Sequence, residues 1–181
     1  MLRQKLLTIR FNNGDADALR QIYELYKDEL VSLAAALLYD KTIAEDAVHD
    51  VFAKLIAQKG SIKITSSLRN YLLTAVANAA RQKHRADKNK PCVSLDQISD
   101  SDIASNYRPD ISVDSDHSRS RLAEVLTMLP YDQREVILLR HFSDLKFKAI
   151  ASIQNVSINT VQGRYRYGLD KLRSLLNGEL R

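Results

Sequence analysis

The spacing of apolar residues between Ala18 and Leu38 constrains this chain more than any other feature. Large apolar and aromatic residues recur there at steps of three and four: Leu19, Ile22, Tyr23, Tyr26, Leu30, Leu33 and Leu37. This spacing gathers them on one face of an α-helix. Residues 13–15, Asn-Gly-Asp, supply turn and capping chemistry just before it. The pattern therefore predicts a long amphipathic helix whose apolar face packs on other helices.

Two more amphipathic helices are expected after it. Thr42 opens a T-I-A-E capping box, and an apolar stripe then runs to Ile56 with Gly60 beyond its end. The polar face of this second helix carries Asp46, His49, Asp50 and Lys54. Ser67 is placed to cap a third helix that reaches about Ala86. Its polar face carries Asn70, Thr74, Asn78, Arg81, Gln82 and Arg85. Such a row can contact nucleobase edges and phosphates, or it can simply be a solvated face, and spacing alone leaves both interpretations open.

The segment 94–118 interrupts the helical pattern. Ser and Asp predominate, and six Asp stand against the single Arg108. Apolar residues are too sparse to pack, which is typical of a flexible linker. We therefore expect two helical domains, residues 10–90 and 119–181, that fold independently on either side of an acidic linker over residues 91–118.

The second half predicts a helix-turn-helix. One helix ends before Pro130, and Asp132 with Glu135 offers a capping signature for the next helix, which reaches Phe142. Helices over 147–154 and from Ile158 to Leu176 follow, with a turn over 155–157 between them. Asn155 stands where this turn needs a left-handed backbone. Helix, tight turn and helix is the layout of a DNA-binding motif, although any three-helix bundle can imitate it.

Composition agrees with an all-α fold and argues against several classes of function. The chain of 181 residues has five Gly, three Pro and no Trp, and 45% of its residues are hydrophobic, enough for a real core. The single Cys92 cannot form an internal disulfide, which fits a reducing cytoplasm. The longest apolar stretch, Leu30 to Tyr39, is too short to span a bilayer, and the first eleven residues lack a long apolar segment and a small-residue cleavage site, so we expect neither secretion nor membrane insertion. Because metal-ligand spacings, phosphate-binding loops and nucleophile motifs are missing, we expect no enzymatic activity, no metal and no cofactor.

Charge divides the first half into two stretches. Residues 13–50 carry nine acidic side chains against three basic ones, whereas residues 59–90 carry eight Lys or Arg against Asp87 alone. The two stretches are therefore expected to face different partners. A local basic excess beside a polar helix is the pattern expected for binding to a phosphate backbone, and a solvated basic face is the alternative.

Three blocks of sequence together resemble extracytoplasmic function (ECF) sigma factors, a group of the sigma-70 family. The blocks are IAEDAVHDVFAKL (Ile43–Leu55), LRNYLLTAVANAARQKHR (Leu68–Arg85) and the helix-turn-helix of Leu129–Leu172. The resemblance covers residues from about 10 to 176. It implies that the first block binds the coiled coil of the largest polymerase subunit, the second melts and reads the minus-ten element, and the third binds the minus-thirty-five element.

The resemblance also implies roles for individual residues. Contacts to polymerase would come from Asp46, His49 and Asp50. Contacts to the minus-ten element would come from Ile62, Lys63, Asn78, Arg81, Gln82, Lys83 and Arg85. Ile62 and Lys63 would help to capture a flipped base, and the Asn78 amide would face the separated strand. Contacts to the minus-thirty-five element would come from Asn159, Thr160, Gln162, Gly163, Arg164 and Arg166. The implied partners are core RNA polymerase and promoter DNA, and the resemblance also allows an anti-sigma factor.

The chain departs from the family pattern at three places. His49 stands where Gln is usual, Tyr71 where Trp is usual, and Lys148-Ala149 replaces an acidic pair. The main alternative hypothesis is a helix-turn-helix regulator that binds duplex DNA without polymerase. Such a regulator would bind its site tightly alone, whereas a sigma factor of this type needs core polymerase to do so.

Overall fold

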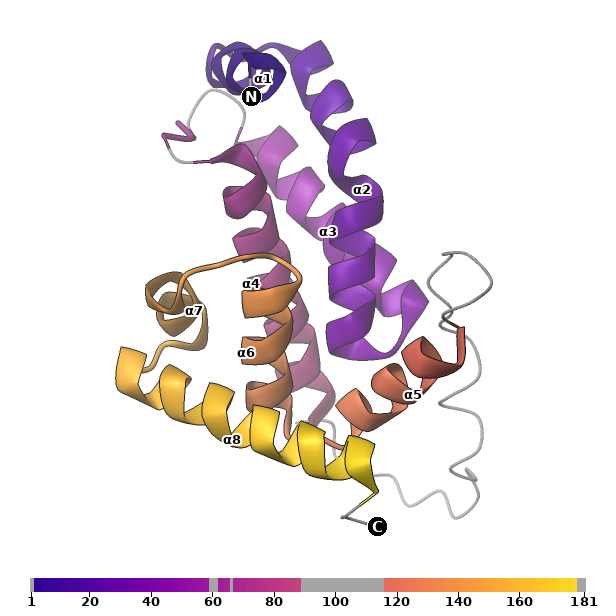
Figure 1. Cartoon of the computed structure of the whole chain (residues 1–181). Coiled ribbons are helices and arrows are strands. Elements are labelled where there is room, and N and C mark those ends of the chain that lie inside the picture. The colour runs from indigo at the N-terminus through magenta and orange to yellow at the C-terminus, as the bar shows by residue number, and fades with distance from the viewer. Residues whose placement is uncertain (1, 59–61, 66, 89–115, 179–181) are drawn as a thin grey trace. The chain divides into compact units, whose positions relative to one another are not determined.

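The apolar stripe predicted between Ala18 and Leu38 forms one long helix, α2 (Figure 1). The structure is a computed structural model that describes residues 2–58, 62–65, 67–88 and 116–178. Within those ranges the helices are α1 (Leu2–Asn12), α2 (Ala16–Leu38), α3 (Lys41–Ala57), α4 (Leu68–Lys88), α5 (Asp116–Thr127), α6 (Tyr131–His141), α7 (Phe147–Gln154) and α8 (Ile158–Asn177). They form two units, α1 to α4 and α5 to α8, and no strand occurs in the described ranges. The prediction of an all-α chain with two helical domains is confirmed.

Most of the predicted acidic linker, residues 91–118, lies outside the described residues. Its last three residues are an exception, because α5 begins at Asp116. The second helical unit therefore starts slightly earlier in the chain than the sequence predicts.

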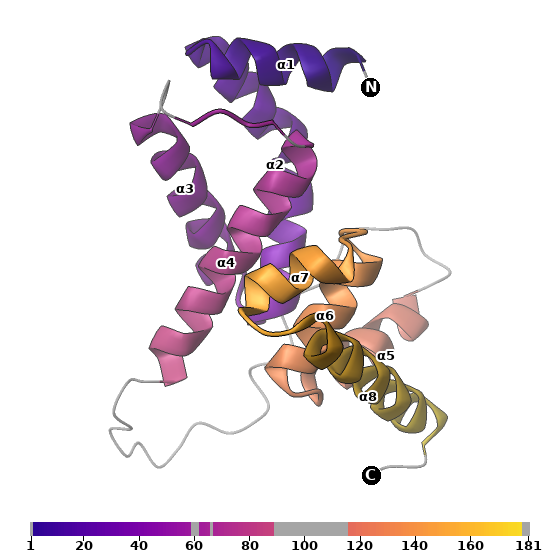
Figure 2. The same cartoon turned by 90° about the vertical axis from the view of Figure 1, so that its left-hand side faces the viewer.

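The first unit is built around the apolar face of α2. Leu30, Leu33 and Leu37 are completely buried on this face, and α2 packs along α4, which contributes the buried Leu72 and Val76. Helix α1, which the sequence did not predict, lies across the end of α2 (Figure 2). It adds two more buried side chains, Leu7 and Phe11.

The start of α2 is fixed by the capping chemistry predicted for residues 13–15. Asp15 Oδ1 accepts hydrogen bonds from the backbone N–H groups of Asp17, at 2.9 Å, and Ala18, at 3.3 Å. Its other oxygen accepts from Arg10 Nε at 2.8 Å. The Arg10 hydrogen bond and the two backbone donors together hold the pKa of Asp15 below its usual value. The negative charge of Asp15 is thus part of the joint between α1 and α2.

The remaining cap predictions have mixed outcomes. Ser67 precedes α4 as predicted, with its Oγ 3.5 Å from the Asn70 backbone nitrogen. The Thr42 prediction is wrong, because α3 begins at Lys41 and Thr42 is already helical. The cap predicted at Asp132 and Glu135 is also wrong, since Pro130 occupies the N-cap position of α6 and no side chain caps it.

The second unit contains the predicted helix-turn-helix, α7 and α8 packed on α6. Asn155 adopts the expected left-handed conformation, with φ 54° and ψ 48°. Gly168 permits close packing of α8 on α6, because a Cβ at this position would lie 3.0 Å from Ile137 Cδ1. Val161, at the centre of the motif, is fully buried. The left-handed turn at Asn155 and the lack of a side chain at Gly168 therefore set the position of α8.

None of the helices in the described ranges has the length and apolar character needed to cross a membrane.

Candidate nucleic-acid interface

The polar side of α4 exposes amides and Arg85, whereas Arg81 and Lys83 lie against their own unit. Asn78, Gln82 and Arg85 are exposed, as the sequence predicts. Arg81 is not: it is only 8% exposed, so its predicted place on the outward face is corrected. The reason is helical geometry, because Arg81 follows the fully buried Ala77 by one turn and shares its face.

Lys83 also lies closer to its own unit than the sequence suggests. Its Nζ is 2.9 Å from Asp50 Oδ2, and the two side chains are 29% and 56% exposed. The sequence assigns Lys83 to DNA and Asp50 to polymerase, yet the structure pairs them with each other. This ion pair joins α3 to α4.

The polar face of α3 matches its prediction. Asp46, His49 and Asp50 are all exposed. His49 Nε2 lies 3.3 Å from the Tyr23 hydroxyl, and the two rings are stacked with centroids 6.4 Å apart. Asp46 makes no hydrogen bond or ion pair within the described residues, so its carboxylate is the most available negative group on this face.

The segment just before α4 is held by a residue that the sequence analysis missed. The Asn12 side chain pairs with the backbone of Ile64: Nδ2 donates to Ile64 O at 3.0 Å, and Oδ1 accepts from Ile64 N–H at 2.9 Å. Ile64 is itself buried, while Ile62 is half-buried and Lys63 exposed. Asn12 therefore fixes the segment on which both predicted base-capture residues lie. No local pattern reveals this contact, because it joins residues 52 positions apart.

The first turns of α8 are exposed and firmly capped. Ser157 Oγ accepts from Thr160 N–H at 3.1 Å and lies 2.9 Å from the Thr160 hydroxyl. The exposed predicted residues on this helix are Asn159, Thr160, Gln162 and Arg166. A Cβ at Gly163 would meet nothing within 4 Å, so the small residue is not required by packing inside the unit. Arg166 lies over the ring of the exposed Tyr167, 5.1 Å from its centroid.

Arg164 is only partly outward, with its side chain 26% exposed. Its Nη2 is 2.8 Å from Asp132 Oδ2, and its Nη1 donates to Gln154 Oε1 at 2.6 Å. The guanidinium is therefore directed toward α6 and α7. Two acceptors inside the unit bind it, and its predicted contact with DNA stays a prediction.

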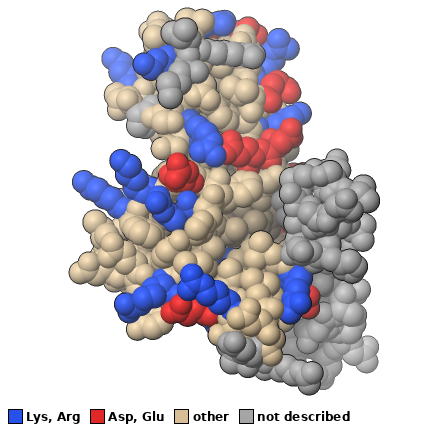
Figure 3. Space-filling view, viewed as in Figure 1, with Lys and Arg blue, Asp and Glu red and all other residues tan. Residues whose placement is uncertain are grey.

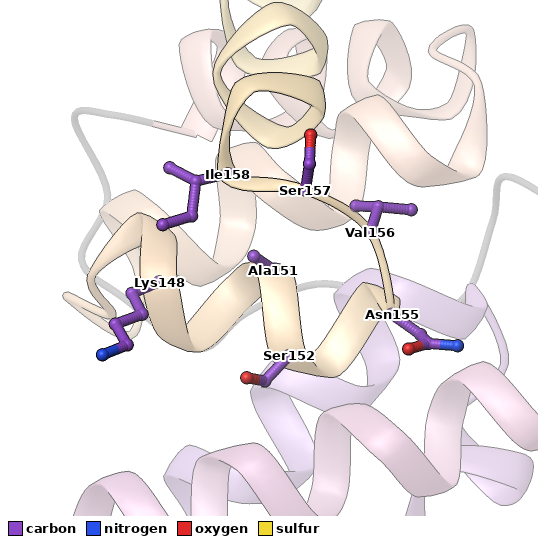
Figure 4. Close-up of a pocket in the computed structure, with 7 residues that line it drawn as sticks. All are labelled: Lys148, Ala151, Ser152, Asn155, Val156, Ser157 and Ile158. Carbon is purple, nitrogen blue, oxygen red and sulfur yellow. The ribbon is translucent and has the colours of Figure 1, made fainter.

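A surface hollow lies at the turn between α7 and α8 (Figure 4). It is lined by Lys148, Ala151, Ser152, Asn155, Val156, Ser157 and Ile158. Lys148 is exposed beside the start of α8, where the departure from the family's acidic pair replaces negative charge by positive charge. Figure 3 shows basic side chains over α7 and along α8, with acidic side chains between them. Because charges of both signs alternate on this surface, it is suited to individual ion pairs and hydrogen bonds more than to a uniform electrostatic attraction.

No cluster of three or more His, Cys, Asp or Glu that could hold a metal ion occurs among the described side chains. The groups available on the three surfaces are amides, hydroxyls, guanidiniums, ammonium groups and carboxylates. These groups form hydrogen bonds and ion pairs with macromolecular partners.

Two family models match the chain. The model for sigma-70 region 2 matches residues 22–90, from within α2 to beyond the end of α4. The model for sigma-70 region 4 matches residues 119–172, which include α6, α7 and most of α8. The chain belongs to the sigma-70 family. Both matches together support a sigma factor over a regulator that acts without polymerase.

Relatives and solved structures agree with this assignment. The chain is similar to the RNA polymerase sigma factor CarQ of Myxococcus xanthus, with 28% identity over 94% of this chain and 95% of that protein. It is also similar to the ECF RNA polymerase sigma factor SigW of Bacillus subtilis, with 25% identity over 97% of each. The sigma factor is therefore of the ECF type, an alternative sigma factor that directs transcription initiation with RNA polymerase.

Among solved structures, one neighbour is the sigma factor RpoE in complex with the anti-sigma factor NepR from Bartonella quintana. The TM-score is 0.63 and the identity 26%, over 87% of this chain and 96% of that chain. CnrH, solved in complex with the cytosolic domain of CnrY, has the same fold, with a TM-score of 0.65 at 18% identity over 98% of this chain and 99% of that one.

Proposed function

We propose that this sigma factor brings core RNA polymerase to promoters through three separate surfaces. The polar face of α3 contacts polymerase through Asp46, His49 and Asp50. Helix α4 and the segment before it contact the separated minus-ten strand through Ile62, Lys63, Asn78, Gln82 and Arg85. The first half of α8 contacts the minus-thirty-five duplex through Asn159, Thr160, Gln162, Gly163 and Arg166.

The observation that carries this proposal is the exposed amide pair on α4. Asn78 and Gln82 lie one helical turn apart and are both exposed on the same side. An amide both donates and accepts, so it can form two hydrogen bonds with the edge of an unpaired base. Contacts with phosphates alone would hold the strand without distinguishing bases. The exposed amides can contact bases of a separated strand, and Arg85, one turn further along α4, can contact its phosphates.

The surface on α3 supports a protein partner. Its exposed carboxylates match the basic side chains that the family resemblance implies on the polymerase coiled coil, and opposite charges speed and orient association. In this proposal polymerase performs the chemistry, the chain itself has no enzymatic activity, and it acts in the cytoplasm where polymerase lies. An anti-sigma factor is a further proposed partner, because the RpoE neighbour was solved with one.

Transcription with purified components tests the proposal. The full chain is mixed with core polymerase and fragments of its own genome, and transcripts are mapped. We expect transcripts only when both proteins are present, starting downstream of one shared pair of sequence elements. Tight binding of the free chain to a specific duplex site, with no transcript from the mixture, would instead identify a regulator that acts without polymerase.

A further inference from the structure

Arg164 lies where the proposed DNA-binding helix meets the two helices beneath it. Asp132, which accepts one side of its guanidinium at 2.8 Å, belongs to α6. Gln154, which accepts the other side at 2.6 Å, is the last residue of α7. One side chain of α8 therefore bonds to both α6 and α7. Its own side chain is 26% exposed and that of Asp132 is 39% exposed.

The Gln154 oxygen is aimed at Arg164 by contacts on the other side of the amide. Gln154 is 3% exposed, and its Nε2 donates to Glu135 Oε2 at 2.7 Å and to Asp132 O at 3.0 Å. Glu135 is fully buried. Because the amide nitrogen is committed to these two acceptors, the amide oxygen has one orientation, toward α8. The network thus runs without interruption from the core to Arg164.

A phosphate contact that turned the Arg164 guanidinium outward would break this network. Withdrawal of the guanidinium would leave the Asp132 carboxylate without this cation and the Gln154 oxygen without its donor. Gln154 is only 3% exposed, so loss of the donor to its amide oxygen would cost free energy. Arg166 and Lys148, both exposed, can meet phosphates without that loss.

Helical geometry supplies the purpose of the inward contact. Residues two positions apart on an α-helix point about 200° apart around its axis. With Arg164 directed inward, Gln162 and Arg166 are directed outward, and both are exposed. A rotation of α8 about its axis would move both of them away from the DNA.

We propose that Arg164 is a positioning residue, which sets the rotation of α8 through Asp132 and Gln154, and that it is not a phosphate contact. The inference rests on the proposed function of α8 in binding the minus-thirty-five duplex. Asp132 is by the same argument a positioning residue of α6. Asp132 therefore increases DNA affinity, although an acidic side chain near the DNA-binding helix would by its charge alone lower it.

The experiment compares Arg164→Ala, Asp132→Ala and the exchange Asp132→Arg/Arg164→Asp in holoenzyme. The probe is a promoter fragment recovered by the transcription experiment, with its minus-thirty-five element intact or scrambled, and affinity is measured over a series of salt concentrations. Loss of an acidic side chain makes the region more positive, so electrostatics alone predicts tighter binding for Asp132→Ala. The positioning role predicts the opposite.

We expect Arg164→Ala and Asp132→Ala each to weaken binding to the intact fragment about tenfold, the equivalent of one charge-assisted hydrogen bond. Their salt dependence should equal that of the wild type, and the exchange should recover part of the affinity. The proposal is overturned if Asp132→Ala binds as well as or better than the wild type. It is equally overturned if Arg164→Ala lowers the salt slope by about one, as loss of a phosphate contact does.

Controls separate this inference from the proposed function. Circular dichroism checks that each variant keeps its helices, and Asp132→Ala removes a side chain that is already 39% exposed. Gln162→Ala reports on α8 directly. If Gln162→Ala and scrambling of the element both leave affinity unchanged, α8 does not read the duplex and the proposed function fails. If they weaken binding while Asp132→Ala does not, the positioning role alone fails.

Discussion

Helices α4 and α8, the two proposed DNA-binding helices, present similar side chains by different means. On each, exposed amides stand beside an arginine that is turned into its own unit, Arg81 on α4 and Arg164 on α8. They differ in what fixes the contact surface. The start of α8 is set locally, by the Ser157 cap and the left-handed Asn155 two residues earlier. The segment before α4 is set from a distance, by the side chain of Asn12.

The difference suits the two proposed targets. A duplex presents a fixed groove, so a helix whose start is capped locally can dock on it. A separated strand has to be held in a shape that the protein imposes, and the imposing segment therefore needs contacts of its own. The comparison leads to four predictions, which begin with the surface that both helices depend on.

Reversal of charge at Asp46 and Asp50 should have the largest effect, because in the proposed function both helices act from polymerase-bound protein. We expect Asp46→Lys together with Asp50→Lys to weaken association with core polymerase about thirtyfold or more, the cost of reversing charge in a complementary interface. Pull-down and circular dichroism measure binding and fold together. Undiminished binding would remove α3 from the polymerase interface.

The ion pair between Asp50 and Lys83 makes single variants necessary in the same experiment. Asp50→Lys alone also leaves Lys83 unpaired, whereas Asp50→Lys/Lys83→Asp retains an ion pair in reverse. Asp46→Lys has no such complication. Asp28→Lys reverses an exposed charge on α2 and is the matched control, for which we expect wild-type association.

The second prediction separates strand reading from duplex binding. We expect Asn78→Ala to weaken promoter opening about five- to hundredfold, since a lost bidentate amide contact costs about 1–3 kcal/mol. Gln162→Ala should weaken initial binding and leave opening at saturating holoenzyme near wild type. Permanganate footprinting at saturation distinguishes the two steps. Asn70→Ala, an exposed amide two turns earlier on α4, is the control. Equal opening by Asn78→Ala and wild type would contradict the assigned role of α4.

Most of the fold could be predicted because its signals are local. The apolar stripe of α2 and the bounds of α7 depend on spacing within a few turns, and Asn155 depends on the conformational tolerance of one residue type. Helix α1 gave a weaker signal. It buries Leu7 and Phe11 but leaves Leu6 and Ile9 more than half exposed, so its apolar residues do not mark a single buried face.

The side chains whose positions differ from the prediction make contacts with residues distant in sequence or lie at the edge of a helical face. Asp132 fits a capping signature, but its partner is Arg164 in another helix. Arg81 and Arg164 lie at the edges of polar faces. A small rotation of the helix about its axis there decides whether a side chain points to solvent or to a neighbouring helix. A helical-face argument therefore finds the exposed amides reliably, while long basic side chains at its edges need the tertiary structure.

The third prediction tests the distant support of the segment before α4. Asn12→Ala removes both hydrogen bonds to the Ile64 backbone, which should destabilise this joint by about 1–2 kcal/mol. We expect slower promoter opening with unchanged binding to the minus-thirty-five element. Asn12→Asp keeps the acceptor for Ile64 N–H and should fall between. Asn13→Ala changes the exposed neighbouring amide and serves as the control. Normal opening by Asn12→Ala would mean that the segment is held without this side chain.

The smallest effect concerns the caps of the two units, one charged and one neutral. Asp15 has a lowered pKa, so its contribution to stability is present above pH 3.8 and is lost as the pH falls through its folded-state pKa. Asn is as good an N-cap as Asp, so Asp15→Asn removes mainly the charge interaction with Arg10. The difference in melting temperature between wild type and Asp15→Asn should be constant near neutral pH. It should shrink and disappear as the pH falls below 3.8.

Ser157→Ala provides the neutral counterpart to this experiment. Loss of the Ser157 cap should cost about 1 kcal/mol. Because a hydroxyl does not titrate in this range, that cost should not change between pH 7 and the acid limit of folding. Thermal unfolding of both variants over one pH series makes the comparison direct. If the Asp15→Asn difference persists unchanged in acid, the cap of α2 acts through its shape as the cap of α8 does, and the charge on Asp15 contributes nothing to the joint between α1 and α2.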